Sequence, residues 1–179
     1  MTNFEVDACL KSMSVLVDNR EQPTTERYEQ RVNSLSVPYR RQTLDYGDYT
    51  YNFILPNGSE LYSPEETVKP SVIVERKMNL EELSSCFTQQ RKRFKDEFQR
   101  ASDNNSVIYL LVEDASWEGI FAGHYKTRFN PAAFIASILG WTARYKIRLI
   151  FCKHESSGKI IKEILYRELK EKLERGEYD

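Results

Sequence analysis

A strand-like stretch of the chain, SVIVERKMN, ends in three adjacent charges. Its Val-Ile-Val run predicts a buried strand, after which come Glu75, Arg76 and Lys77. Because successive side chains of a strand point to opposite faces, we expect Glu75 and Lys77 on one face and Arg76 on the other. A carboxylate can bind a divalent metal, and a neighbouring lysine can orient a water or stabilise charge on a phosphate. An ordinary ion pair at an exposed strand end is the alternative interpretation.

Carboxylates also accompany two other predicted strands. Asp48 follows a glycine in YGDY, where an ordinary turn aspartate is the alternative. Asp18 ends the apolar part of MSVLVDNRE, and Glu21 comes shortly after it; strand-end solvation followed by a helix cap is the alternative there. Three strand ends that each deliver carboxylates predict one acidic pocket. Hard oxygen ligands of this kind suit Mg²⁺ or Mn²⁺.

The elements that must position these residues alternate along the chain. Strands are expected at residues 13–18, 71–77, 106–113 and 146–152. Helices are expected at residues 24–35, 79–100, 130–145 and 156–176. Two further strands within 39–55 would join at a tight turn near Gly47, and a long loop would carry Trp117, Phe121 and Tyr125. This order predicts an α/β fold with a mixed sheet between helical layers.

Composition narrows the class of protein. The 179 residues fit one domain with its own core, and no apolar run approaches the roughly 20 residues that span a membrane. The N-terminus lacks the basic and apolar segments of a secretory signal. Three cysteines, far apart and odd in number, favour a reducing intracellular location over a disulfide framework. Cys152 and His154 lack a second ligand pair, which argues against zinc.

Charge is nearly balanced, but it is clustered. A formal net charge of −1 does not by itself predict a nucleic-acid binder. Basic residues nevertheless gather with aromatic residues at 39–42, 90–95, 124–129 and 144–148. Each cluster alone has a solvated helix face as its alternative interpretation. The interleaved aromatics favour contacts with the backbone and bases of a nucleic acid.

Four motifs in order resemble those of a known family. VDNRE, GDY, VIVERK and QQRKRF are similar to the nuclease domain of XPF-type structure-specific endonucleases, whose hallmark is GD and then ERK-x₃-D. The resemblance covers roughly residues 14–113 by motif. It implies a restriction-endonuclease-like fold with the PD-(D/E)XK core: a three-layer α/β/α arrangement with a central mixed β-sheet.

The resemblance implies a role for each matching acid and for the lysine. Asp48 and Glu75 would be the core metal ligands. Asp18 and Glu21 would complete the acidic cluster, with Asp18 as a further ligand or an outer residue. Lys77 would lie beside the attacking water. The implied cofactor is Mg²⁺ or Mn²⁺.

The resemblance also implies DNA contacts. Arg76 would brace neighbouring acids or reach DNA. Arg93 matches an arginine that the family keeps on the helix after ERK, and Arg91 is the alternative if the alignment slips. An arginine at this position can bind phosphate through two hydrogen bonds. The other candidate DNA-binding residues come from the basic clusters: Lys92, Arg40, Arg41, Lys126 and Arg128.

The chain departs from the family pattern in two places. Glu81 stands where the family has aspartate, four residues after the lysine, and its extra methylene moves the carboxylate by roughly an ångström or more. We expect a supporting catalytic role, with an ordinary first-turn acid as the alternative. No helix-hairpin-helix DNA-binding domain follows the predicted nuclease domain, which we take as residues 1–179. Such a domain would act alone or with an accessory DNA-binding protein.

The activity that the resemblance implies is metal-dependent hydrolysis of DNA phosphodiester bonds. Branched DNA such as flaps, forks or junctions would be the substrate, in recombination, repair or replication. A catalytically weak DNA-binding partner subunit of the same family is one alternative, and a sequence-specific restriction-type enzyme is another. Relatives pair through their nuclease domains, so a homodimer is expected. The apolar stripe of the last helix, together with Ile138 and Trp141 on the helix before it, could supply the shared face, or could pack in the core instead.

Overall fold

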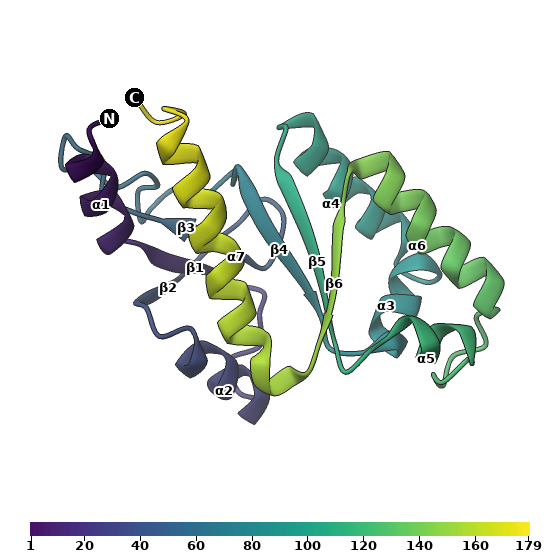
Figure 1. Cartoon of the computed structure of the whole chain (residues 1–179). Coiled ribbons are helices and arrows are strands. Elements are labelled where there is room, and N and C mark those ends of the chain that lie inside the picture. The colour runs from purple at the N-terminus through teal and green to yellow at the C-terminus, as the bar shows by residue number, and fades with distance from the viewer.

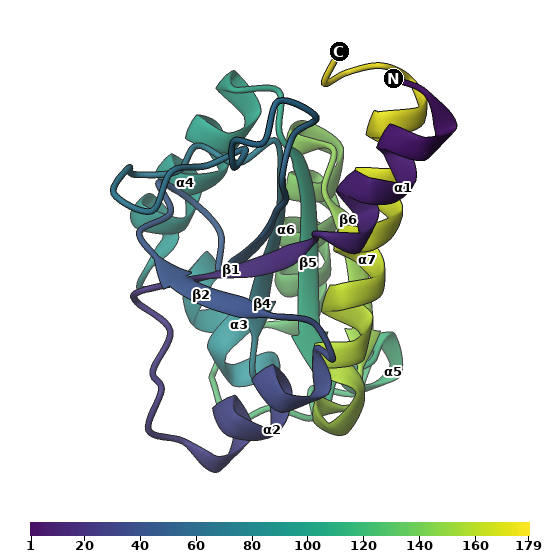
Figure 2. The ribbon, with the colours of Figure 1, turned by 90° about the vertical axis from the view of Figure 1, so that its left-hand side faces the viewer.

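Two layers of helices enclose one β-sheet in the computed structural model, which describes all 179 residues (Figure 1). The strands are β1 (Ser14–Asp18), β2 (Tyr39–Gln42), β3 (Tyr49–Asn52), β4 (Val72–Lys77), β5 (Val107–Glu113) and β6 (Arg148–Cys152). The helices are α1 (Asn3–Lys11), α2 (Glu26–Ser34), α3 (Leu80–Phe87), α4 (Arg91–Asp103), α5 (Trp117–Phe121), α6 (Pro131–Tyr145) and α7 (His154–Glu174). The turned view shows β1 and β2 crossing the direction of β4 and β5 (Figure 2).

The order of the six strands is β2-β1-β3-β4-β5-β6. β3 runs antiparallel to its neighbours β1 and β4, whereas every other pair is parallel. The carboxyl ends of β1, β4 and β5 therefore meet the amino end of β3 at one edge of the sheet. This topology explains how carboxylates from distant parts of the sequence reach one place.

Each face of the sheet carries its own hydrophobic core. Alternate strand residues such as Val15, Val17 and Val74 pack beneath α1, α2 and α7. The strand residues that point to the other face, such as Ile73 and Leu110, pack beneath α3, α4 and α6. The two chain ends lie side by side on the first face, where the N-terminal ammonium pairs with Asp179 (Figure 1). The predicted mixed sheet between helical layers is confirmed.

The two strands predicted within 39–55 exist, but they do not form a hairpin. β2 and β3 lie on opposite sides of β1 and pair with it rather than with each other. Their connection crosses the end of β1, where Asp18 Oδ2 accepts a hydrogen bond of 2.9 Å from the amide of Leu44. A local turn signal cannot reveal that a third strand separates the two that it joins.

The predicted helix over 79–100 is two helices. Asn79 caps α3 as expected, accepting a hydrogen bond from the amide of Glu82. The backbone leaves the helical region at Thr88, and α4 begins at Arg91. This break lets the rings of Phe87 and Phe94 meet edge to face, 5.8 Å apart. The break thus accompanies an aromatic contact in a segment that contains neither proline nor glycine.

Two short helices were not expected from the sequence. α1 begins with a capping box in which Thr2 and Glu5 exchange hydrogen bonds. α5 lies within the predicted loop 114–129 and is capped by Ser116. None of the helices is both long and apolar enough to cross a membrane.

The apolar side chains considered for a dimer face are inside the chain. Ile138 is 1% exposed and Trp141 is 3% exposed, both beneath α3 and α4. The apolar residues of α7 that face the sheet are also buried: Ile161, Leu165, Leu169 and Leu173. Core packing is therefore their role, and a homodimer stays a prediction without an assigned face.

Candidate active site

A polar hollow of about 430 Å³ lies at the edge of the sheet where β4 ends. Only two of its fifteen lining residues are hydrophobic. Asp48, Glu75 and Lys77 share this hollow with Arg93 from α4. A cavity with this lining suits a charged, hydrated ligand rather than an apolar one.

β4 supplies two of the site residues through strand alternation. Glu75 and Lys77 point to the face covered by α3 and α4, and the Lys77 ammonium donates a hydrogen bond to Glu75 Oε1. The other carboxylate oxygen, Glu75 Oε2, is buried and has no hydrogen-bond partner. A buried carboxylate oxygen without a partner is uncommon and calls for a ligand or a proton.

Asp48 reaches the same hollow from the turn before β3. Its backbone is held on both sides: its N–H donates to Val74 O at 3.1 Å, and its C=O accepts from Asp18 N at 2.8 Å. Its side-chain Oδ2 accepts a hydrogen bond of 2.7 Å from the amide of Arg76. The carboxylate is thus fixed against the end of β4, beside Glu75.

The turn itself depends on Gly47. This residue has φ +77°, in the left-handed region that favours glycine. A Cβ placed there would lie 2.8 Å from the Cβ of Ile73, a contact that real side chains do not make. Glycine therefore lets the turn press against β4 and deliver Asp48 beside it.

The carboxyl groups of the hollow differ in their titration. Desolvation raises the pKa of Asp48 well above its usual value, and the charges of Glu75 and Glu21 raise it further. Desolvation also raises the pKa of Glu75, although the Lys77 ammonium opposes this effect. Burial alone would lower the pKa of Lys77, but the Glu75 and Asp48 carboxylates raise it overall. Negative charge is crowded here, and the charges of Lys77 and Arg76 offset it only in part, as in a site for a divalent metal.

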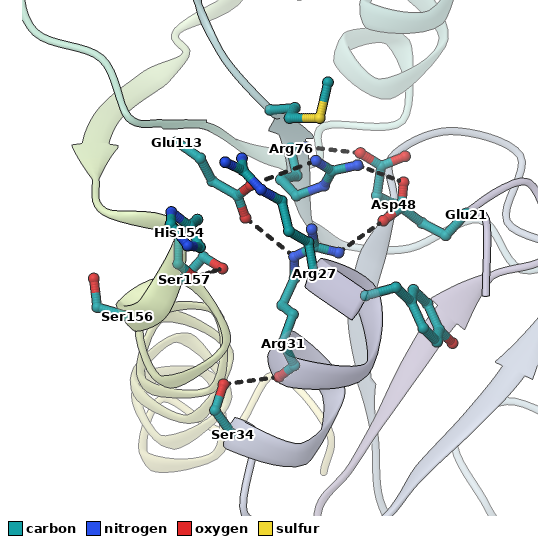
Figure 3. A network of polar contacts seen from close by, with 12 residues as sticks. Glu21, Arg27, Arg31, Ser34, Asp48, Arg76, Glu113, His154, Ser156 and Ser157 are labelled. Atoms are coloured by element: carbon teal, nitrogen blue, oxygen red, sulfur yellow. Dashed lines mark hydrogen bonds and ion pairs between the residues drawn. The ribbon is translucent and has the colours of Figure 1, made fainter. Parts of the chain in front are cut away.

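The opposite face of β4 carries a closed ring of ion pairs (Figure 3). The Arg76 guanidinium lies 3.2 Å from Glu21 and 3.6 Å from Glu113. Arg31 on α2 completes the ring, 3.1 Å from Glu113 and 3.4 Å from Glu21. The hydroxyl of Tyr49 donates a further hydrogen bond of 2.8 Å to Glu21. The expectation that Arg76 braces neighbouring acids agrees with this arrangement.

Asp18 lies at the same edge of the sheet but does not line the hollow. Its carboxylate is fully buried and accepts hydrogen bonds from the amides of Arg20 and Leu44 and from the Arg20 guanidinium. Glu21 does line the hollow, yet both of its oxygens are bonded within the ion-pair ring. Of the four acids that the sequence placed at strand ends, these contacts leave Asp48 and Glu75 as the two with coordination capacity.

Glu81, which stands where the family pattern has aspartate, does not line the hollow. Its side chain accepts a hydrogen bond of 3.2 Å from the amide of Lys126. The neighbouring Glu82 lines the hollow instead, 4.0 Å from the Lys77 ammonium. The register of α3 after its Asn79 cap decides which of the two acids faces inward.

The predicted DNA-binding residues fall into two groups. Arg93 lines the hollow, and Lys92 and Arg93 both line an adjoining polar hollow along α4. Arg91 instead donates to Phe87 O and lies over the ring of Trp141, and it lines neither hollow. The remaining four do not line either hollow: Arg40, Arg41, Lys126 and Arg128. Arg40 pairs with Glu60.

Sequence reasoning did not single out three residues of this region. Glu113 ends an apolar strand as Glu75 does, so the same signal was present. Arg31 follows the buried Tyr28 by three residues, on the inward side of α2. Glu97 follows the buried Phe94 by three residues and is itself buried on α4. A charge on the inward side of an amphipathic helix is the signal that would have found the last two.

A second group with metal-ligand chemistry lies outside the hollow. Asp114, His154 and Glu155 bring their ligand atoms within 4.8 Å of one another. Asp114 already pairs with His154 at 2.9 Å and with Arg27 at 3.4 Å. The cluster is largely exposed, and its internal ion pairs account for its geometry.

The family model of the ERCC4 domain matches residues 17–164. The chain belongs to the ERCC4 domain family. XPF from Aeropyrum pernix is similar in structure, with a TM-score of 0.58 and 21% identity over 87% of this chain and 61% of that one. XPF from Aeropyrum pernix in complex with DNA gives a TM-score of 0.56 and 23% identity over 86% of this chain and 63% of that one.

The ERCC4 match confirms the prediction of an XPF-type nuclease domain with a restriction-endonuclease-like α/β fold. All four sequence motifs lie within the matched residues. The chain spans about three fifths of the length of the two XPF structures. No protein of curated function matches the chain significantly in sequence.

Proposed function

We propose that this ERCC4 domain hydrolyses phosphodiester bonds of DNA with the help of a divalent metal held by Asp48 and Glu75. The observation that carries the proposal is the buried Oε2 of Glu75, which has no hydrogen-bond partner. Glu75 lies in a hollow that it shares with Asp48, and arginine and lysine side chains line the same hollow. Glu113 Oε2 in the ion-pair ring also lacks a hydrogen bond, but it faces the Arg76 guanidinium at 3.6 Å and Glu113 does not line the hollow, whereas Glu75 lines it beside Asp48.

The donor set fits Mg²⁺ or Mn²⁺. Asp48 and Glu75 offer hard carboxylate oxygens, and desolvation makes their ionised forms costly without a cation. A bound ion of this kind would polarise the phosphate and lower the pKa of a water to be used as the nucleophile. Asp18 and Glu21 hold protein groups through their own oxygens, so we assign them to shaping the site rather than to the ion.

Lys77 and Arg93 supply the positive charge that hydrolysis needs. The pKa of Lys77 is raised, so its ammonium stays protonated and can orient a water or offset charge on the phosphate. Arg93 is exposed at the mouth of the hollow and can bind a phosphate oxygen. Glu82, beside Lys77, takes the supporting place that the sequence suggested for Glu81.

We propose branched DNA as the substrate. Arginine and lysine side chains along α4 would contact phosphates of the DNA. Phosphates carry no sequence information, so the shape of the DNA would decide specificity. The XPF structure solved with DNA supports nucleic acid as the partner of this fold. Repair, recombination or replication would use such an activity inside the cell.

Cleavage of a panel of labelled DNAs tests the proposal. Flap, fork, junction and linear duplex substrates of one sequence are incubated with the parent, with Asp48→Asn and with Arg167→Ala on the far layer. We expect Mg²⁺-dependent cuts on branched substrates by the parent and by Arg167→Ala, and none by Asp48→Asn. Equal cutting by Asp48→Asn would show that the site is assigned wrongly. Cutting of linear duplex at one sequence would favour a restriction-type enzyme.

A further inference from the structure

Glu97 is a buried acid of the hollow that the proposed reaction does not use. It lies on α4, its side chain is 8% exposed, and it lines both the main hollow and the adjoining one along α4. Its neighbours on the inward side of the helix are the buried Phe94 and Phe98. A carboxylate at this position costs desolvation, so its partners indicate what it does.

The partner of Glu97 is the turn that carries Asp48. Glu97 Oε1 accepts a hydrogen bond of 3.1 Å from the buried amide of Gly47. The same oxygen lies 3.7 Å from the guanidinium of Arg20, which is itself bonded to Asp18 at the end of β1. Glu97 therefore joins α4 to the turn and to the end of a second strand.

A second contact holds α4 to the same segment. Arg100, three residues after Glu97, donates a hydrogen bond of 2.9 Å to the carbonyl of Asp45. The segment between these contacts cannot relax toward β4, because Gly47 already presses against Ile73. The Gly47 amide would lose its only acceptor if Glu97 were removed, and the turn would move to find another.

We propose that Glu97 is a positioning residue, which fixes the Gly47 turn through its hydrogen bond and so holds the Asp48 carboxylate in register with Glu75. This inference rests on the proposed function, since it concerns the geometry of the same metal site. The rate of a displacement on phosphate depends steeply on that geometry, and a shift of about 1 Å can cost about 100-fold.

Two substitutions separate the hydrogen bond from the charge. Glu97→Gln keeps an oxygen that can accept from the Gly47 amide, whereas Glu97→Ala removes it and suits a helix. Asp103→Ala, on the exposed end of the same helix, is the matched control. Three readouts are compared in the full chain: hydrogen exchange of the Gly47 amide by NMR, Mn²⁺ affinity by calorimetry without DNA, and kcat and KM on the preferred DNA.

For Glu97→Ala we expect Gly47 exchange and the Mn²⁺ dissociation constant to rise about tenfold each, and kcat to fall about 100-fold with KM nearly unchanged. Glu97→Gln should stay within about threefold of the parent in all three, because a neutral acceptor makes a weaker but similar bond. Asp103→Ala should match the parent.

Three results would overturn the inference in distinguishable ways. Parental Gly47 exchange and Mn²⁺ affinity in Glu97→Ala would show that the turn does not need this acid. Equal damage in Glu97→Gln and Glu97→Ala would assign the effect to charge instead of the hydrogen bond. A parent that neither binds Mn²⁺ nor cuts DNA would remove the proposed function, and the inference with it.

Discussion

The two faces at the end of β4 both carry buried charges but pair them differently. On the face toward α2 and α7, Arg76 and Arg31 alternate with Glu21 and Glu113 in a closed ring. On the face toward α3 and α4, Glu75 has one oxygen bonded to Lys77 and one with no partner. The first face sets two arginines against two acids, although Glu113 Oε2 and Arg76 Nε also lack hydrogen bonds, and the second is left with excess negative charge.

This difference assigns a task to each face. Buried charges that are mutually paired add little net stability, but they fix the parts that they join, here α2, β4 and β5. Buried carboxylates without full pairing destabilise the empty site and favour a cation. Strand alternation between Glu75 and Arg76 separates the two tasks by one residue.

We call the face toward α3 and α4 the catalytic face, and the face toward α2 and α7 the braced face. The largest expected effect is on the catalytic face. Glu75→Gln removes the anionic ligand and should lower the cleavage rate about 10³-fold or more, since loss of a metal ligand costs several kcal/mol in the transition state. Rate measurements under single-turnover conditions test this, with Glu171→Gln on the exposed side of α7 as the control. A rate within tenfold of the parent would contradict the division between the faces.

The next effect is on the braced face and concerns stability. Arg31→Ala leaves Glu113, which is 0% exposed, without its closest partner. We expect the free energy of unfolding in urea to fall by about 3–5 kcal/mol. Replacing both residues, as Arg31→Met with Glu113→Leu, should recover much of that loss. A loss below about 1 kcal/mol in the single variant would mean that the ring does not brace the sheet.

A smaller effect is expected from pH on the catalytic face. Desolvation raises the pKa of Asp48, so the folded chain holds its proton at pH values where the unfolded chain has lost it. Ionisation therefore costs stability as the pH rises above about 4, the usual aspartate value, until it passes the raised pKa. The substitution Asp48→Asn avoids this cost, because the amide does not ionise.

Metal-free Asp48→Asn should accordingly melt about 2–4 °C above the parent at pH 7, the shift that ~1 kcal/mol produces in a chain of this size. The difference should shrink as the pH falls toward 4, and added Mg²⁺ should stabilise the parent alone. Thermal unfolding across this pH range provides the measurement. A variant less stable than the parent at every pH would argue that Asp48 is a structural acid.

The smallest expected effect is on DNA affinity. Arg93→Ala, made in the Asp48→Asn background to prevent cleavage, should weaken binding several-fold and reduce the slope of log affinity against log salt by about one. Arg91→Ala serves as a comparison, because Arg91 lies over Trp141 and does not line the hollow. Equal losses in the two variants would count against a specific phosphate contact at Arg93.

Much of the fold could be predicted because its signals are local. The apolar runs that became β4 and β5, the Asn79 cap and Pro131 at the start of α6 all act within a few residues. The relation of β2 to β3 could not be predicted, because it depends on β1 lying between them. The break before α4 likewise depends on distant aromatic partners such as Trp141.

The residues of the candidate site could likewise be predicted from the sequence only in part. Strand alternation predicted the shared face of Glu75 and Lys77 from sequence alone. The ring around Arg76 needed α2 and β5 to be placed in space, so Arg31 and Glu113 were missed. The sequence left Asp18 as either a further metal ligand or an outer residue, and the hydrogen bonds that it accepts from Arg20 and Leu44 favour the outer position.

Diffraction from crystals of the parent soaked in Mn²⁺, with data collected at the manganese edge, tests directly whether Asp48 and Glu75 bind a metal. We expect an anomalous peak between the carboxylates of Asp48 and Glu75, and no such peak in crystals of Asp48→Asn soaked in the same way. A parent structure with Mn²⁺ elsewhere, or with no peak at this position, would contradict a metal site on the catalytic face of β4.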